Sequence, residues 1–248
     1  MISAIIPARY ASSRFPGKPL ALIAGKPMIQ HVYERVSQAS KVSSVYVATD
    51  DERIARVVVD FGGEYIMTDS DLPTGTDRVA AAAREIRADI IINVQGDEPL
   101  ISPEIIDATC GPLLSNPALD VATPIVRITT MEELLNPNVA KVVLGDKMRA
   151  LYFSRSVIPF QRDVPMDEWL QRATYWKHIG LYAYRRAALE GFVEEEQTEL
   201  EELEQLEQLR LLCRGYNITC VEAYSEAIAV DRPEDIARVE AKLLEKVL

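Results

Sequence analysis

Short apolar runs alternate with amphipathic segments along the first hundred residues of the chain. Residues 90–94 (IIINV) give the strongest strand signal, because a continuous β-branched run suits a strand that is buried on both faces of a sheet. Shorter apolar runs predict three more strands, at residues 2–7, 44–49 and 65–67. Apolar residues at helical spacing predict helices between the strands and at the end of the chain, over residues 27–39, 51–61, 77–87 and 233–248.

The pattern changes beyond residue 120, where strands no longer alternate regularly with helices. Gly145 and Asp146 separate two strand-like segments, which predicts a turn with antiparallel pairing. The Glu-rich segment 194–210 carries a leucine at every third position from Leu200 to Leu209 and predicts one solvated amphipathic helix. The strands predicted in this half of the chain cover residues 121–126, 140–144, 150–154, 179–184 and 217–223.

Strands that alternate with helices are typical of an α/β fold. We therefore predict a mainly parallel central sheet with helices on both of its faces. The predicted organisation is one domain over residues 1–248, with a smaller β-containing insertion at about residues 121–185 that serves substrate or dimer contacts. A chain of 248 residues buries roughly 70–75% of the surface that it exposes when unfolded. We expect a sizeable core that needs neither disulfides nor metals.

The chain is acidic overall, with 27 Lys and Arg against 38 Asp and Glu and a formal net charge of −11. This balance argues against a nucleic-acid-binding surface, which needs clustered positive charge. The start of the chain differs from the rest, because residues 1–33 contain no acid and four basic residues, namely Arg9, Arg14, Lys18 and Lys26. The sequence thus predicts a small, local anion site near its beginning.

The chain contains no run of about 20 apolar residues that could cross a bilayer, and its start lacks the pattern of a secretory signal. We therefore expect a cytoplasmic protein without membrane insertion. The three cysteines, Cys110, Cys213 and Cys220, have no metal-ligand spacing, and buried thiols are their expected state. Two histidines in the whole chain exclude a metal site built from several histidines.

The loop after the first predicted strand (ARYASSRFPGKPL) contains Arg9, Arg14 and Lys18. Ligands of α/β sheets bind outside the carboxyl ends of the strands, so this loop is a candidate polyphosphate site. Two common nucleotide fingerprints are absent, because GxGxxG does not occur and Lys18 is followed by proline where a P-loop needs Ser or Thr. The alternative is a set of exposed cations on a flexible loop.

Two acids follow predicted apolar segments. Asp97 comes after the strand at 90–94, within the motif VQGDEP, and Asp231 comes after AIAV. Mg²⁺ takes one or two carboxylates together with phosphate oxygens, so the two acids could share one ion. The alternatives are that Asp97 stabilises a turn, and that Asp231 caps the last helix with Glu234 completing a capping box.

The motif TGTDR at residues 74–78 opens a predicted helix. Thr76 is its predicted N-cap, Gly75 lets a ligand approach the backbone closely, and Arg78 can donate to a base carbonyl. Elsewhere, His178 is a lone histidine in a strand-like segment, and a satisfied structural histidine is the alternative to a site residue.

Nine motifs follow one another along the chain. They are IPARYASSRFPGKPL, VATDD, TGTDR, INVQGDEPLI, AKVVL, ALYFSRSVIP, KHIGLYAY, LEQLR and VDRPEDIARVE. The set resembles the 3-deoxy-manno-octulosonate (Kdo) cytidylyltransferases, also called CMP-Kdo synthetases, from residue 2 to about residue 240. The resemblance implies a nucleotide-diphospho-sugar-transferase-like fold, a homodimer and dependence on Mg²⁺. The implied reaction is CTP + Kdo → CMP-Kdo + pyrophosphate, which serves lipopolysaccharide synthesis.

The resemblance also implies roles for single residues of this chain. The triphosphate would be bound by Arg9, Arg14 and Lys18, and catalysis would rest on these three residues together with Asp97. The backbone of Gly75 and Thr76 and the side chain of Arg78 would recognise cytosine, while Asp97 and Asp231 would hold Mg²⁺. The sugar acid would be contacted by Gln95, Arg155, His178, Tyr182 and Glu207.

Two departures from the family pattern leave the choice of sugar acid open. The run before LEQLR is unusually rich in Glu, and Phe160 stands where some relatives have tryptophan. An amino-substituted octulosonate or a sialic acid is therefore an alternative substrate. A catalytically silent nucleotide-binding protein is a further alternative, against which the presence of both Asp97 and Asp231 argues.

Overall fold

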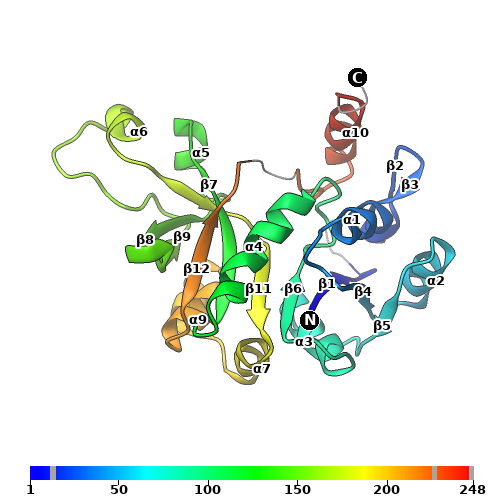
Figure 1. Ribbon diagram of the computed structural model, residues 1–248. Coiled ribbons are helices and arrows are strands. Elements are labelled where there is room, and N and C mark those ends of the chain that lie inside the picture. The colour runs from blue at the N-terminus through cyan, green and yellow to red at the C-terminus, as the bar shows by residue number, and fades with distance from the viewer. Residues whose placement is uncertain (12–14, 225–227, 246–248) are drawn as a thin grey trace. The chain divides into compact units, whose positions relative to one another are not determined.

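The structure is a computed structural model that describes residues 1–11, 15–224 and 228–245. The chain divides into two compact units, the first made of Met1–Asp107 with Ser225–Leu248 and the second of Ala108–Tyr224 (Figure 1). Arg14 lies outside the described residues. The predicted single domain with an insertion at about residues 121–185 stays a prediction.

The first unit is built on a parallel sheet whose strands have the order β5, β4, β1, β6. These strands are β1 (Ile2–Ala8), β4 (Ser44–Thr49), β5 (Tyr65–Met67) and β6 (Ile90–Asn93). All four residues of β6 are buried, as the unbroken apolar run predicts. Crossover connections place α1 (Met28–Ser37) and α2 (Glu52–Asp60) on one face and α3 (Gly75–Arg84) on the other (Figure 1). The predicted α/β fold with a mainly parallel sheet between helices is confirmed.

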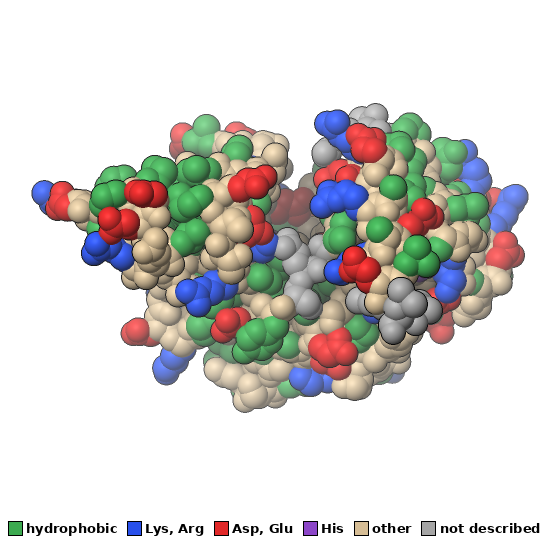
Figure 2. All heavy atoms as spheres, turned by 90° about the horizontal axis from the view of Figure 1, so that it is seen from above, with side chains coloured by type: hydrophobic (Ala, Val, Ile, Leu, Met, Phe, Trp, Pro, Cys, Tyr) green, Lys and Arg blue, Asp and Glu red, His purple; other side chains and the backbone are tan. Residues whose placement is uncertain are grey.

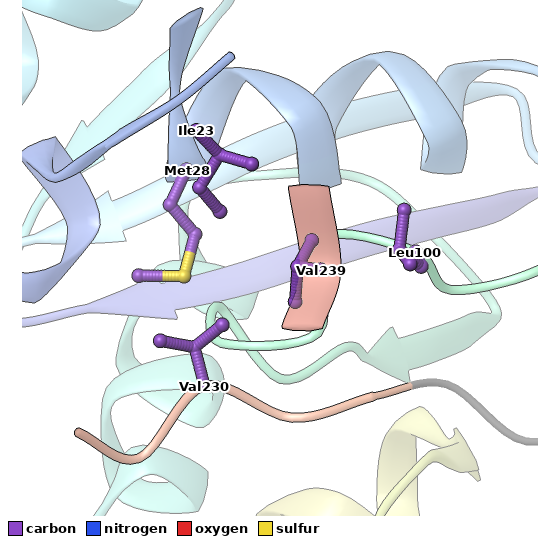
Figure 3. Close-up of a cluster of buried hydrophobic side chains, with 5 residues drawn as sticks. All are labelled: Ile23, Met28, Leu100, Val230 and Val239. Atoms are coloured by element: carbon purple, nitrogen blue, oxygen red, sulfur yellow. The ribbon is translucent and has the colours of Figure 1, made fainter. Parts of the chain in front are cut away.

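A small apolar cluster in the first unit fixes the segments that carry the predicted acids (Figure 3). It joins the hairpin of β2 (Leu22–Ile23) and β3 (Lys26–Pro27) to α10 (Asp235–Glu245). The cluster is formed by Ile23, Met28, Leu100, Val230 and Val239. Leu100 lies just after Asp97 in the sequence and Val230 lies just before Asp231, so packing of this cluster holds both acidic loops against the sheet.

The second unit is mainly antiparallel. Its central strand β7 (Val121–Arg127) pairs with β10 and β11 in antiparallel register and with β12 in parallel register. The predicted turn at Gly145 and Asp146 is confirmed, because β8 and β9 flank it and pair antiparallel. The remaining strands are β8 (Lys141–Leu144), β9 (Ala150–Ser154), β10 (Trp176–His178), β11 (Tyr182–Arg185) and β12 (Ile218–Glu222).

The predicted single helix over residues 194–210 is wrong. Thr198 caps a new helix by a reciprocal capping box with Glu201, and Gln205 adopts a left-handed conformation (φ 52°) that ends it. The structure therefore has three short helices in this part of the chain, α7 (Arg186–Glu194), α8 (Glu199–Glu204) and α9 (Gln208–Cys213). The other helices are α4 (Pro103–Ser115), α5 (Met131–Leu135) and α6 (Trp169–Arg172), with short 3-10 turns at Lys18–Leu20, Asp146–Met148 and Met166–Glu168.

Acidic and basic side chains are interspersed over the face shown in Figure 2. Among the described helices, none has the length and apolar character needed to span a membrane. Cys110 and Cys220 are buried as expected. The expectation is wrong for Cys213, which is exposed at the end of α9.

Candidate active site

The predicted acids of the first unit meet at one lysine. Lys18 donates from Nζ to Oδ2 of Asp97 at 2.6 Å, and the same nitrogen lies 3.9 Å from Oδ1 of Asp231. Asp97 follows the carboxyl end of β6, whereas Lys18 opens the 3-10 turn Lys18–Leu20. Asp231 is 58% exposed, while the other two side chains are mostly covered. Three residues that are distant in the sequence thus form one charged cluster.

Backbone contacts set the geometry of this cluster. The N–H of Val230 donates to the carbonyl of Asp97 at 2.9 Å, and Nζ of Lys18 donates to the carbonyl of Val230 at 2.9 Å. Gly17 precedes Lys18 with φ +70°, a conformation that glycine adopts without strain. The lysine therefore bonds to both of the loops that carry the acids.

Close packing of Gly96 against β1 supports a prediction about the loop of Asp97. A Cβ at this position would lie 2.8 Å from the carbonyl oxygen of Pro7, which is backbone and cannot turn aside. Gly96→Ala should therefore displace the loop and lower the free energy of unfolding by about 1–3 kcal/mol. Urea unfolding measures the loss, and unchanged stability with unchanged turnover would contradict the close approach.

The alternative of Asp231 as a helix cap is wrong. Helix α10 begins at Asp235, so Asp231 lies outside the capping position. The carboxylate of Asp235 instead accepts from the N–H groups of Arg232 at 2.9 Å and Asp231 at 3.0 Å. These backbone hydrogen bonds hold the pKa of Asp235 below its ordinary value. Asp235 thereby fixes the turn that presents Asp231.

The donor set of this cluster fits a magnesium ion. Two carboxylates already approach one cation, the ammonium of Lys18, and carboxylate oxygens are the protein ligands that Mg²⁺ prefers. Within the described ranges, no group of three or more His, Cys, Asp or Glu side chains could hold a metal. Mg²⁺ bound by Asp97 and Asp231 would thus take its other ligands from phosphate and water, as this ion commonly does.

The N-terminus of α3 differs from the prediction in its cap. Thr74, and not Thr76, is the N-cap, because its hydroxyl accepts from the N–H of Asp77 and the Asp77 carboxylate accepts from the N–H of Thr74. Thr76 is buried inside the first turn, where its hydroxyl accepts from Nδ2 of Asn93 at 3.4 Å. Gly75 is the first residue of the helix.

Arg78 is fully buried below this helix end. Its guanidinium donates to Oδ2 of Asp50 at 3.1 Å and to the hydroxyl of Thr68. Burial lowers the pKa of Arg78, and the charge of Asp50 acts in the opposite direction. Arg9 donates to the carbonyl of Leu72 at 2.9 Å. Both arginines thus brace the segment before α3, and recognition of cytosine by Arg78 stays a prediction.

Three of the predicted sugar contacts gather in the second unit. The ring centroids of His178 and Tyr182 lie 5.2 Å apart. Burial raises the pKa of Tyr182 well above its ordinary value, and the neighbouring charge of Glu207 acts in the same direction. His178 ends β10, Tyr182 begins β11, and Glu207 directly precedes α9. The structure thus places these three side chains in one neighbourhood.

Arg155 has a different setting from these three residues. Its guanidinium donates to the backbone carbonyls of Glu204 at 2.6 Å, Gln205 at 3.1 Å and Pro137 at 3.0 Å. Arg155 therefore holds the turn between α8 and α9 that leads to Glu207. Gln95 belongs to the first unit, two residues before Asp97.

The protonation of His178 gives a second prediction. Burial lowers the pKa of this ring from 6.5 to about 3, so below pH 6.5 the unfolded chain binds a proton that the folded chain does not. The resulting stability is complete above pH 6.5 and is lost as the pH falls toward 3. Between pH 7.5 and 5, this histidine should lower the free energy of unfolding of the wild type by up to about 2 kcal/mol. The variant His178→Gln should lack this part of the fall. Equal falls in both proteins, measured with urea, would contradict it.

Sequence reasoning missed the residues that support the site. Asp50 follows the predicted strand at 44–49, and its position at a strand end is a signal that could have been used. Thr74 stands three residues before Asp77, which is the spacing of a capping box. Thr123, whose hydroxyl contacts His178, gave no signal, because the two residues meet only through the pairing of β7 with β10.

Comparisons with known proteins bear on the whole chain. The cytidylyltransferase family model matches residues 3–221. A protein of Geobacter sulfurreducens named 3-deoxy-manno-octulosonate cytidylyltransferase is 54% identical over 247 residues, covering 98% of this chain and 99% of that protein. A protein of the same name from Pelobacter propionicus is 52% identical over 244 residues, covering 96% of this chain and 95% of that protein.

Solved structures agree with this result. A structure of CMP:2-keto-3-deoxy-manno-octonic acid synthetase complexed with CTP superposes with a TM-score of 0.92 at 44% identity, covering 99% of each chain. A 4-diphosphocytidyl-2C-methyl-D-erythritol synthase from Anaerococcus prevotii, 14% identical with a TM-score of 0.63 and covering 98% of this chain and 96% of that one, shares the fold. The resemblance drawn from the motifs is confirmed. The chain therefore belongs to the cytidylyltransferase family and, within it, to the 3-deoxy-manno-octulosonate cytidylyltransferases.

Proposed function

We propose that the protein transfers CMP from CTP to the anomeric hydroxyl of Kdo, giving CMP-Kdo and pyrophosphate for lipopolysaccharide synthesis. The observation that carries the proposal is the 54% identity, over nearly the full length of both chains, to a protein named for this reaction. The cluster of Lys18, Asp97 and Asp231 supports it, because the reaction needs positive charge and a metal near a triphosphate.

The chemistry matches the residues of the first unit. The anomeric oxygen attacks the α-phosphorus and its hydroxyl proton passes to water, so that a new P–O bond forms. The bond between the α-phosphorus and the oxygen that bridges to the β-phosphate breaks, and pyrophosphate leaves. Negative charge on the phosphoryl oxygens would be balanced by Lys18, Arg9 and Arg14. Catalysis of this kind rests on positioning and on cations more than on a strong side-chain base.

Asp97 and Asp231 would hold Mg²⁺ in this reaction. The ion, when bound, neutralises phosphate charge and orients the leaving group. The two carboxylates are suited to this role because their loops are joined by the backbone contact between Val230 and Asp97. Lys18 keeps the carboxylates close together by giving them a shared positive charge.

The remaining assignments follow from the resemblance. Cytosine would be read at the start of α3, by the backbone of Gly75 and Thr76 and by Arg78. For the sugar acid we propose contacts from Gln95, His178, Tyr182 and Glu207. Arg155 would act mainly by holding the turn before Glu207, since its guanidinium is bonded to three carbonyls. A homodimer and a cytoplasmic location also belong to this proposal.

A pyrophosphate-release assay tests the proposal. The protein is incubated with CTP, Mg²⁺ and one acid at a time: Kdo, an amino-substituted octulosonate or a sialic acid. We expect release with Kdo and none when the acid or CTP is omitted. If pyrophosphate is released faster with one of the other acids, that acid and not Kdo is the substrate. No release with any acid, although CTP binds, would support a silent nucleotide-binding protein.

A further inference from the structure

The hydroxyl of Thr123 lies at the centre of a small hydrogen-bond network in the second unit. Its oxygen lies 2.9 Å from Nε2 of His178 and 2.8 Å from the carbonyl oxygen of Leu181. The carbonyl oxygen of Ile179 is a third neighbour at 3.3 Å. Thr123 itself is fully buried on β7.

The number of hydrogens in this network decides the form of the histidine. A threonine hydroxyl has one proton to donate, and a carbonyl oxygen can only accept. Two oxygens 2.8 Å apart require a proton between them, so the hydroxyl of Thr123 donates to Leu181. The hydroxyl must then accept from Nε2 of His178, which places the ring proton on Nε2 and leaves the lone pair on Nδ1.

The surroundings of the ring keep this form neutral and fixed. Phe153 contacts the His178 ring edge-on at 5.2 Å and Tyr182 lies at the same centroid distance. The N–H of His178 donates to the carbonyl of Ala140 at 2.9 Å, so backbone pairing fixes the base of the side chain as well. Burial lowers the pKa of the ring to about 3, and the imidazole is therefore uncharged near neutral pH.

We propose that Thr123 is a positioning residue that holds His178 in the Nε2–H form, so that Nδ1 accepts a hydrogen bond from a hydroxyl of the sugar acid. The proposal rests on the proposed function for the identity of the ligand. A neutral acceptor suits a sugar hydroxyl, which must donate to it. A site that is built to accept such a bond discriminates against analogues that lack the hydroxyl.

The tautomer can be measured directly in the protein without substrates. The chain has two histidines, so ¹⁵N-histidine labelling gives two rings, and His31→Gln removes one of them for assignment. Long-range ¹H–¹⁵N spectra distinguish a protonated nitrogen from one with a free lone pair. We expect protonated Nε2 and unprotonated Nδ1 for His178 in the wild type and in Thr123→Ser, which keeps the hydroxyl.

Removal of the hydroxyl should change both the tautomer and the kinetics. In Thr123→Val we expect a mixture of tautomers and a KM for Kdo that is about 3–10-fold higher, with the KM for CTP unchanged. Thr123→Ser, which keeps the hydroxyl, should have the tautomer and the KM for Kdo of the wild type. Thr219→Val is the matched control, because Thr219 lies on β12 beside Ala122 and its change is chemically the same.

The outcomes separate this proposal from the proposed function. Protonated Nδ1 in the wild type, or an unchanged tautomer in Thr123→Val, overturns the role of Thr123, and the first test stands even if the valine variant does not fold. A changed tautomer with an unchanged KM for Kdo overturns the contact with the sugar acid. A wild-type protein with the expected tautomer but no activity toward CTP and Kdo overturns the proposed function and with it the contact with the sugar acid, whereas the role of Thr123 in fixing the tautomer stands.

Discussion

Replacing Asp97 with asparagine should lower turnover by about 10²–10³-fold, the effect of losing one preorganised electrostatic stabiliser. The change keeps the size of the side chain and removes its charge, so the proposed ligand of Mg²⁺ is lost. The loop itself should stay in place, because it is held by the backbone contact with Val230 and by packing of Leu100. Pyrophosphate release across a Mg²⁺ titration measures the effect, and thermal unfolding monitors the fold.

Asp231→Asn belongs in the same experiment. If both acids hold one ion, it should also lower turnover and shift the Mg²⁺ requirement upward, since either carboxylate then binds the metal alone. Glu234→Gln is the matched control, because Glu234 is an exposed acid of the same segment and lies outside the cluster. Wild-type turnover and metal dependence in Asp97→Asn would remove that residue from the site.

Replacing Arg210 with methionine should lower the free energy of unfolding by about 3–5 kcal/mol. The guanidinium forms two hydrogen bonds with the carboxylate of Glu201, at 2.8 Å and 2.6 Å, and both side chains are almost fully buried. It also donates to the carbonyls of Phe192 and Glu195. Methionine would leave the carboxylate of Glu201 buried without its partner, which is the costly part of the change.

A second arginine of the same region provides the control. Arg214 pairs with Glu195 at 2.9 Å, but both side chains are about two-fifths exposed. Arg214→Met should therefore cost about 1 kcal/mol or less. Combining Arg210→Met with Glu201→Leu should recover part of the loss, because no charge is then left buried. Similar small losses in both arginine variants, measured by urea unfolding, would contradict the importance of the buried pair.

The sheet of the first unit was predictable because its strands are short, apolar runs, and β6 is buried throughout. β4, β5 and β6 lie where their apolar runs predict strands, and the turn between β8 and β9 follows from Gly145 and Asp146. The break in segment 194–210 was not predictable from the sequence, because the leucine spacing continues through Gln205 although the backbone there is left-handed. A buried ion pair between α8 and α9, which spacing does not reveal, favours the broken arrangement.

Prediction of the candidate site depended on the same feature, the strand end. Asp97 could be placed because it follows an unmistakable strand, and Asp231 because it follows an apolar segment. Burial of Arg78 could not be predicted, since its partners Asp50 and Thr68 lie in other loops and meet it only through tertiary packing. The cap at Thr74 was missed because TGTDR offers two threonines, and the acid three residues later selects the first.

The bond between Lys18 and the carbonyl of Val230 joins residues separated by 212 positions. A ribosome that has made the first hundred residues has already supplied Lys18, Asp97 and the four parallel strands of the first unit. The second acid arrives only after the whole second unit has been synthesised. A polypeptide that stops before residue 230 lacks Asp231 and the bond that holds Lys18, so the charged cluster is completed only after the second unit has been made.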